Sequence, residues 1–344
     1  MAKVDKKVKF PSELRLDLVS KDWVIIATGR AKRPEAFRKE KHEEKKILKK
    51  DCPFCNVSQQ EKPVAVYVRG QKVKGEEMPK DWTTVVFPNK YPALKPNSHL
   101  DAKIEGDLYE TINAVGFCEV VVTRDHEKSL ALLSRKHVKE VIDSYQDRYL
   151  DLMDKKFVNY ISIFHNHGQE AGASQSHPHS QIITTPLVDV DLQRALANAS
   201  RYFRKNKKCI YCQMQELEMK AKSRIVFENE DFLATCPFAS KAAFQVIISP
   251  KNHLPYFERI NEKEKWQLAE ALQASLKKLY KGLSNPAYNF YLHTAPCDGK
   301  DYSYYHWHWT ILPKTASWAG FELGARMEIS TIEPEKAAEY LRKQ

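Results

Sequence analysis

The run His177-Pro178-His179-Ser180-Gln181 contains the residues best suited to chemistry in this chain. Side chains alternate along a β-strand, so His177 and His179 are predicted to share a face, with Gln181 beyond them. His177 could then hold a metal ion while His179, fixed beside it by the rigid Pro178, faces an incoming phosphate. An imidazole with a pKa of about 6.5 is largely neutral and nucleophilic near neutral pH. The run therefore predicts reversible transfer of a nucleotidyl group through His179.

Two cysteine pairs of identical spacing, each followed by two histidines in the same order, indicate metal sites. A Cys-x-x-Cys turn presents two thiolates from one backbone knuckle, and zinc prefers four tetrahedral nitrogen or sulfur ligands. The alternative is that the cysteines are buried thiols and the histidines surface groups. Because protein fills all four positions, we expect each metal to be structural. The predicted sets are Cys52, Cys55, His126 and His177, and Cys209, Cys212, His253 and His306.

A polar loop with two glycines, Gly168 and Gly172, precedes the histidine run. Glycines allow a ligand to approach the backbone closely, and backbone N–H groups together with Ser174 could surround an α-phosphate. Such a loop is weak evidence by itself. Its place directly before two histidines with a metal context strengthens the prediction of a phosphate site.

The elements that position these residues occur twice in the chain. Each half has a Cys pair, a β-branched run that ends in a polar turn and a His, a helix, a returning strand and a second His. The interval between the two histidines differs by only two residues between the halves. The first half is longer between its Cys pair and first His, which we interpret as an insertion between Val57 and Trp82.

Each half is predicted to be an α+β unit with an antiparallel sheet and a helix packed on one face. Ser134 can cap the helix of the first half, and Asn261 with Glu264 forms a capping box for the second. The expected domains are residues 1–190 and 191–344. A helix from Asp191 to Lys205 is expected to join them.

Composition restricts the partners that we expect. No stretch reaches the roughly 20 apolar residues of a membrane helix, and the first residues lack the apolar block of a secretory signal, so we expect a cytoplasmic protein without a membrane partner. The net charge of +11 suits phosphorylated small molecules as well as nucleic acid. A zinc-containing nucleic-acid-binding protein and a non-catalytic nucleotide-binding scaffold are the competing classes. The dispersed charge argues against the first, and His179 against the second.

These motifs resemble the galactose-1-phosphate uridylyltransferase family, a branch of the histidine triad superfamily, over almost the whole chain. The resemblance implies two tandem histidine-triad-like units, the first with the nucleophile and a zinc site, the second with another metal site. It implies that UDP-glucose transfers its uridylyl group to His179, that glucose 1-phosphate leaves, and that galactose 1-phosphate takes the group. The matching segments are 30–34, 52–55, 87–94, 125–126, 166–181 and 320–322.

Residue by residue, the resemblance implies that His179 is the nucleophile and that Gln181 hydrogen-bonds to the nucleotidyl phosphate. Histidine triad hydrolases carry a third His at the position of Gln181, and an amide cannot protonate a leaving group, which favours a transferase. Phe321 and Glu322 match contacts that come from a neighbouring subunit, which implies a homodimer. Nucleotide and phosphate contacts are implied for Arg30, Arg33, Asn89, Asn166, Gly172 and Ser174.

Some positions depart from the family pattern. Lys90 stands where an Asp is common, and Ser180 replaces the usual Gly. Many members bind iron at the second site through a Glu and three His, and no convincing Glu follows Pro186 in this chain, so zinc or iron is expected there. The second Cys/His set resembles that of the relative that phosphorolyses ADP-glucose, which is the alternative function. His308, equivalent to His179 in the second half, is interpreted as a relic that either packs in the core or lies next to the metal.

Overall fold

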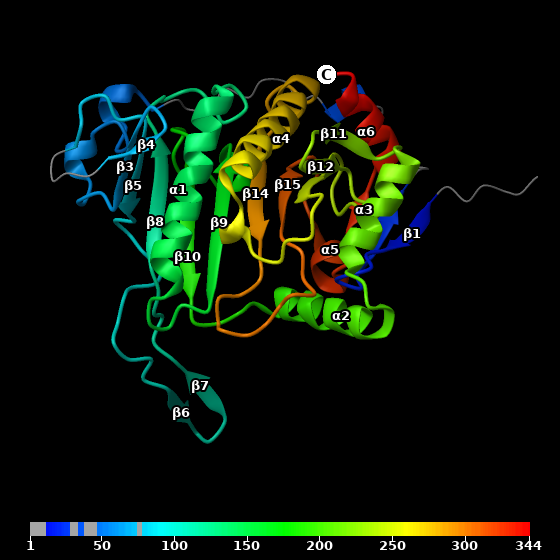
Figure 1. Cartoon of the computed structure of the whole chain (residues 1–344), viewed down its shortest axis with the longest axis horizontal. Coiled ribbons are helices and arrows are strands. Elements are labelled where there is room, and N and C mark those ends of the chain that lie inside the picture. Colours follow the sequence, from blue (N-terminus) through cyan, green and yellow to red (C-terminus); the bar gives the residue numbers. More distant parts are fainter. Residues whose placement is uncertain (1–11, 28–33, 38–46, 74–77) are drawn as a thin grey trace, which may run out of the picture.

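The computed structural model describes residues 12–27, 34–37, 47–73 and 78–344 (Figure 1). Its centre is an antiparallel sheet in which eleven strands of the described chain follow the order β11-β12-β13-β15-β14-β9-β10-β8-β5-β3-β4. The first half of the chain supplies β3 (Ala65–Val68), β4 (Gln71–Lys72), β5 (Thr84–Pro88), β8 (Cys118–Thr123), β9 (Tyr160–His167) and β10 (His179–Thr185). The second half supplies β11 (Ile225–Glu228), β12 (Phe232–Thr235), β13 (Val246–Pro250), β14 (Tyr288–His293) and β15 (His308–Pro313).

The two predicted units share one sheet. Strands β9 and β14 pair across the boundary between the halves, with Asn166 opposite Asn289 in their register. The order of strands on one side of this boundary repeats on the other, so β9, β10, β8 and β5 correspond to β14, β15, β13 and β12. Each half is an antiparallel α+β unit as predicted, and edge-to-edge pairing joins their backbone hydrogen bonds into a continuous ladder.

One long helix from each half covers the same face of the sheet (Figure 1). They are α1 (Arg135–Met153) and α4 (Glu262–Gly282), and both predicted caps are present: the Ser134 side chain accepts from the backbone N–H of His137, and Asn261 and Glu264 form a capping box. Both helices bury apolar residues at helical spacing against the sheet, in a core that contains Tyr145, Leu276 and Trp309. Helix α6 (Pro334–Arg342) packs against β11 and α4.

The opposite face is covered differently in the two halves. Over the first half lies the Cys52–Cys55 turn, whose Phe54 belongs to a cluster with Val85, Phe87 and Val122. Over the second half lie α2 (Val190–Asn206) and α3 (Ile210–Ala221), which correspond to the predicted joining helix and the second Cys pair. A small sheet of β1 (Glu13–Leu16), β2 (Trp23–Ile26) and β16 (Ile329–Ser330) and helix α5 (Gly320–Ala325) lie on the same side of the molecule as α2 and α3 (Figure 1).

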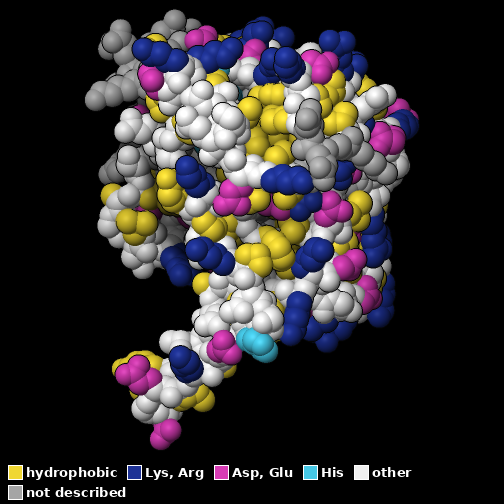
Figure 2. All heavy atoms as spheres, turned by 90° about the vertical axis from the view of Figure 1, so that its left-hand side faces the viewer, with side chains coloured by type: hydrophobic (Ala, Val, Ile, Leu, Met, Phe, Trp, Pro, Cys, Tyr) yellow, Lys and Arg dark blue, Asp and Glu magenta, His cyan; other side chains and the backbone are white. Residues whose placement is uncertain are grey.

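A hairpin of β6 (Lys103–Glu105) and β7 (Tyr109–Thr111) projects from the body of the molecule (Figures 1 and 2). It lies between β5 and β8, where the second half has a much shorter connection between β12 and β13. The prediction of one insertion between Val57 and Trp82 was therefore wrong, because most of the additional length follows β5. Short 3₁₀ turns occur at Pro34–Phe37, Lys49–Asp51, Val57–Gln59, Gln169–Ala171 and Phe257–Arg259.

On the face shown in Figure 2, basic and acidic side chains are interspersed, in agreement with the dispersed charge of the sequence. None of the helices in the described part of the chain is long and apolar enough to cross a bilayer.

Candidate functional site

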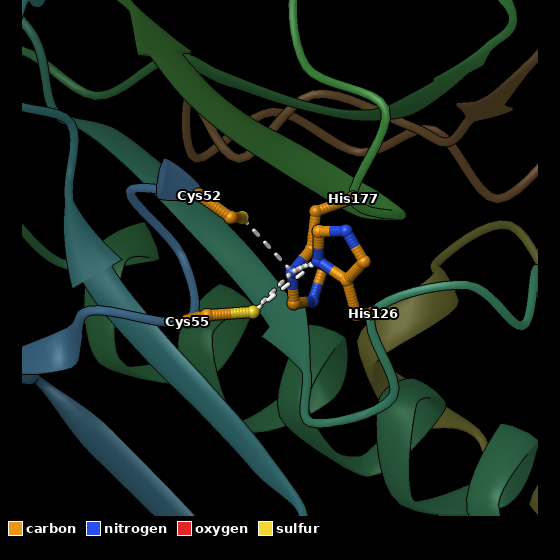
Figure 3. A group of neighbouring side chains, drawn as sticks. All are labelled: Cys52, Cys55, His126 and His177. Atoms are coloured by element: carbon orange, nitrogen blue, oxygen red, sulfur yellow. Dashed lines mark hydrogen bonds between the residues drawn. The ribbon is translucent and has the colours of Figure 1, made fainter. Parts of the chain in front are cut away.

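The first predicted metal set converges in the structure (Figure 3). Its four ligand atoms lie within 4.8 Å of one another. His177 Nδ1 lies 3.4 Å from Cys52 Sγ and 3.3 Å from His126 Nδ1, and Cys55 Sγ lies 3.2 Å from His126 Nδ1. Bonds of about 2.0 Å to nitrogen and about 2.3 Å to sulfur would place tetrahedral ligand atoms about 3.3 to 3.8 Å apart. The three separations given above fit such an ion, so these residues could hold zinc.

The protonation of both histidines in this cluster also suits a metal. The Nε2–H of His177 donates to the carbonyl oxygen of Thr123 at 2.7 Å, and the Nε2–H of His126 donates to that of Ile47 at 2.9 Å. A carbonyl oxygen only accepts, so each ring carries its hydrogen on Nε2 and leaves the Nδ1 lone pair for a ligand bond. Burial lowers the pKa of His177 to about 4, which keeps the ring neutral.

The second predicted set converges in the same way. Cys212 Sγ lies 3.4 Å from His253 Nδ1 and 3.5 Å from His306 Nδ1, and all four ligand atoms, including Cys209 Sγ, lie within 4.8 Å. The Nε2–H groups of His253 and His306 donate to the carbonyl oxygens of Ser303 and Pro250. The halves thus carry two clusters of the same donor set, each with Nδ1 as the histidine donor.

His179 is the first residue of β10 and is 7% exposed. Its Nδ1–H donates to the carbonyl oxygen of His177 at 2.9 Å, which leaves the lone pair of the neutral ring on Nε2. The ring of Phe54, from the cysteine turn, packs against it at 4.9 Å between centroids. Burial lowers the pKa of His179 below its ordinary value. The site therefore holds a neutral imidazole with one nitrogen anchored and the other able to act as a nucleophile.

His177 does not lie in the strand, contrary to the prediction of simple alternation, because β10 begins at His179. The two histidines are related instead by the hydrogen bond from His179 to the His177 carbonyl. Within β10, Ser180 points to the helix face, where its Oγ lies 2.6 Å from the Tyr145 hydroxyl and 3.0 Å from His165 Nδ1. His179 and Gln181 consequently share the opposite face.

The glycine loop follows β9 and leads into the histidine run, as predicted. It contains a 3₁₀ turn at Gln169–Ala171, between Gly168 (φ 81°) and Gly172 (φ 84°), both in conformations that glycine tolerates best. A recess of about 350 Å³ opens here, next to His179 in the chain. Its described lining carries no acidic side chain and includes Asn166, Gly168, Ser174, Ser176 and Pro178. Neutral N–H and O–H groups around such a recess can donate hydrogen bonds to a phosphate.

Asn166 also lies on the face of His179. Ser180 pairs with His165 in the β10–β9 register, so His179 and Asn166 are the next residues along the two strands. Asn89 directly follows β5, in alternation with Val85 and Phe87 of the same face, and its Oδ1 accepts from the backbone N–H of Tyr91.

The other predicted contacts are Arg30, Arg33, Phe321 and Glu322. Arg30 and Arg33 lie outside the described residues. Phe321 and Glu322 lie on α5, which Figure 1 shows over the second half beside α2 and β15, apart from β10. Phe321 is 50% exposed, and the Glu322 carboxylate accepts from the backbone N–H of Ala319.

The second half repeats part of the site. The Nδ1–H of His308 donates to the carbonyl oxygen of His306 at 3.2 Å, and Tyr211 of the second cysteine turn packs on its ring at 5.5 Å. The position that corresponds to Asn166 is occupied by His293, directly opposite His308 in the register. A cavity of about 400 Å³ lies here, and its lining includes Asp17, Asp22, Asp189, Asp191 and Glu218.

Two further sets of residues contact the predicted site residues and were not predicted from the sequence. Phe54 and Tyr211 occupy the same position in the two cysteine turns, and this match in the sequence could have indicated a shared role. Each ring packs on the histidine two residues after the second histidine ligand of its cluster. Asn289 belongs to the strand predicted for the second half, but only the pairing of β14 with β9 places it beside Asn166.

Comparison with known proteins agrees with this geometry. The family model for the N-terminal domain of galactose-1-phosphate uridyl transferase matches residues 3–189, and that for the C-terminal domain matches residues 195–343. An ADP-glucose phosphorylase of Arabidopsis thaliana is 30% identical over 334 residues, which cover 96% of this chain and 92% of the relative. A galactose-1-phosphate uridylyltransferase of Thermotoga maritima is 30% identical over 339 residues, which cover 96% of this chain and 98% of the relative.

Solved structures show the same two relationships. A crystal structure of an ADP-glucose phosphorylase from Arabidopsis thaliana with bound ADP-glucose has a TM-score of 0.80 at 28% identity, with 97% of this chain and 99% of that chain covered. A uridylyltransferase structure has a TM-score of 0.73 at 28% identity, with 96% and 97% covered. With both family domains matched in order and both cysteine–histidine clusters assembled, this chain belongs to the galactose-1-phosphate uridylyltransferase family.

Proposed function

We propose that this protein is a nucleotidyltransferase that forms a covalent nucleotidyl-histidine on His179, with UDP-glucose as donor and a hexose 1-phosphate, galactose 1-phosphate first, as acceptor. The observation that carries the proposal is the fixed tautomer of His179. Its Nδ1–H is bonded to the His177 carbonyl, so Nε2 carries the lone pair of the neutral ring, and the recess of the glycine loop lies next to His179 in the chain.

The reaction proceeds in two displacements at the α-phosphorus. Nε2 of His179 attacks this phosphorus, the N–P bond forms, and the bond to the bridging oxygen breaks as glucose 1-phosphate leaves. A phosphate oxygen of the acceptor then attacks the same phosphorus, and the N–P bond breaks. Nδ1 keeps its hydrogen throughout, so the His177 carbonyl stabilises the positive charge of the nucleotidylated ring. Gln181 is assigned to hydrogen-bond the transferred phosphate without supplying a proton.

The other predicted site residues have matching roles in this proposal. Asn166, the backbone around Gly172 and the Ser174 hydroxyl would donate hydrogen bonds to the transferred phosphate, and Asn89 would contact the nucleotide. Arg30 and Arg33 would contribute guanidinium groups to the phosphates. In this division, residues 1–190 hold the nucleophile, and residues 191–344 hold the second metal site.

ADP-glucose phosphorolysis is the second candidate, in which inorganic phosphate accepts an adenylyl group from the same histidine. The observation that favours it is the second cluster, where Cys209 and Cys212 complete the set with His253 and His306. A relative named for this activity has the same fold and binds ADP-glucose in its crystal structure.

Zinc is the metal that we assign to the first cluster, because two thiolates and two imidazoles form a donor set that it prefers. The same donors favour zinc over iron in the second cluster. A metal at the first cluster would act through position, because the cluster holds the His177 ring while the His177 carbonyl orients His179. Four protein donors leave no place for substrate on either ion.

A homodimer with a shared active site would explain why α5 exposes large apolar side chains. Its Phe321 and Leu323 are 50% and 65% exposed, as expected for side chains that a second copy covers. Sedimentation measures the assembly. Co-expression of His179→Ala with a Phe321→Ala/Glu322→Ala variant tests sharing, because a mixed dimer retains one complete site and should recover activity. Nucleic acid and membranes have no part in this function.

The test of the proposed function is intact mass measurement after incubation with UDP-glucose or with ADP-glucose. The proposal predicts a uridylyl adduct on the wild type and none on His179→Ala. An adenylyl adduct alone, discharged by inorganic phosphate, would select the second candidate. No adduct with either donor would contradict a covalent mechanism.

A further inference from the structure

Asn289 is a residue of the second half whose side chain contacts the glycine loop of the first half. It lies on β14 directly opposite Asn166 on β9. Its Nδ2 donates to Asn166 Oδ1 at 2.8 Å and to the carbonyl oxygen of Ala171, in the loop, at 2.8 Å. Strand pairing thus aligns His179, Asn166 and Asn289 in one row across three strands, all on the face opposite α1.

These two contacts determine the orientation of both amides. The Ala171 carbonyl only accepts, so Asn289 must present its nitrogen to the loop. Because the second contact uses the same nitrogen, Asn166 must present its oxygen to Asn289. The Nδ2 hydrogens of Asn166 are therefore directed away from Asn289, and this nitrogen has no hydrogen-bond partner in the described part of the chain.

We propose that Asn289 is a positioning residue that holds Asn166 with its amide hydrogens toward the transferred phosphate and anchors the glycine loop at Ala171. This inference rests on the proposed nucleotidyl transfer. An amide with its N–H groups toward a phosphate stabilises the negative charge of the transition state, whereas the flipped amide presents an oxygen and opposes it. The second half of the chain thereby contributes to chemistry performed by the first.

Asn289→Asp is the sharpest test, because it preserves shape and replaces a double donor by an acceptor. The carboxylate would repel the Ala171 carbonyl and favour the flipped Asn166 amide. We expect single-turnover nucleotidylation of His179 to slow about 10- to 100-fold, with a smaller loss for Asn289→Ala.

Asn159→Asp is the matched control. The Asn159 side chain also donates to a backbone carbonyl, that of Pro186 at 2.7 Å, on an adjoining part of the sheet. We expect its nucleotidylation rate to stay within about twofold of the wild type. An equal loss in Asn159→Asp and Asn289→Asp would assign the effect to general weakening of the sheet and overturn the inference.

A double-mutant cycle separates positioning from stability. If Asn289 acts through Asn166, adding Asn289→Ala to Asn166→Ala should slow nucleotidylation by much less than Asn289→Ala does alone. The unfolding temperature of each variant is measured separately, so that a loss of stability is not mistaken for a loss of positioning. Fully additive losses, or a wild-type rate in Asn289→Asp, would overturn the inference while leaving the function on His179 intact. A wild type that forms no adduct would overturn the proposed function and this inference together.

Discussion

The two halves of the sheet contain the same device and differ in what surrounds it. In each, a cysteine–histidine cluster holds a histidine whose backbone carbonyl accepts from the Nδ1–H of the histidine two residues later. In each, an aromatic ring from the cysteine turn packs on that second imidazole. Cluster, tautomer and ring packing are therefore insufficient to define an active site.

The difference lies in the neighbours of the two imidazoles. Beside His179 stands Asn166, whose amide can donate to a phosphate, whereas His308 faces His293, whose pKa burial lowers to about 3. The recess of the first half is lined by loop amides and hydroxyls, and the cavity of the second by several carboxylates. Carboxylates raise the energy of a bound phosphate, so we expect a phosphate to bind less well beside His308 than beside His179.

The largest expected difference between the halves is in the two imidazoles themselves. His179→Ala removes the nucleophile and should lower turnover by on the order of 10⁴-fold or more. His308→Ala should change turnover by less than about threefold, because carboxylates line the cavity beside His308 and disfavour a bound phosphate. Steady-state kinetics with the preferred nucleotide sugar measures both. Comparable losses would break the distinction between the halves.

The metal clusters should differ next. Cys55→Ser is expected to reduce turnover about 10- to 100-fold, because the first cluster orients the carbonyl that holds His179. Cys212→Ser should lower the unfolding temperature with little effect on the turnover of folded protein. Metal analysis should give about two zinc ions per wild-type chain and fewer in each variant. Equal kinetic losses at matched folded fractions would contradict the separate roles.

The pH dependence sharpens the comparison further. Burial holds the pKa of His179 below its ordinary value of about 6.5, so the neutral nucleophile persists as pH falls through that value. Single-turnover nucleotidylation should decline toward acid pH with a midpoint below about 6.5. His308→Ala should leave this midpoint in place. A midpoint at or above the ordinary histidine value would place the reacting imidazole in a more exposed setting.

The smallest expected effect is equal in the two halves. Ser134→Ala and Asn261→Ala each remove an N-cap of one of the helices behind the sheet, and each should lower the free energy of unfolding by about 1 kcal/mol. Urea denaturation measures both values. Nucleotidylation rates of the folded variants should match the wild type.

The sequence predicted what depends on local spacing. The cysteine turns, the histidines that complete both clusters and the caps of α1 and α4 follow from short-range patterns, and all are present. Repetition of these patterns along the chain indicated two α+β units. A nucleophile at His179 could be proposed because its run combines a metal ligand with a second imidazole.

Long-range pairing could not be read from the same patterns. A strand edge carries no sequence signal for its partner, so the single sheet and the contact of Asn289 with Asn166 appear only when β14 pairs with β9. The hairpin of β6 and β7 is short and exposed. The second half has no equivalent segment, so the repeat could not locate this insertion in the sequence. Phe321 and Glu322 lie on α5, away from β10 of the same chain. This agrees with the expectation that they contact the site of a second copy, which a single chain does not show.

Locating the nucleotidyl group within the chain tests the central claim most directly. The wild type is to be incubated with UDP-glucose and with ADP-glucose, digested under neutral conditions that preserve phosphoramidates, and mapped by peptide fragmentation. We expect one modified residue, His179, and an unmodified His308. Modification of His308, or transfer that continues unchanged in His179→Ala, would contradict this expectation.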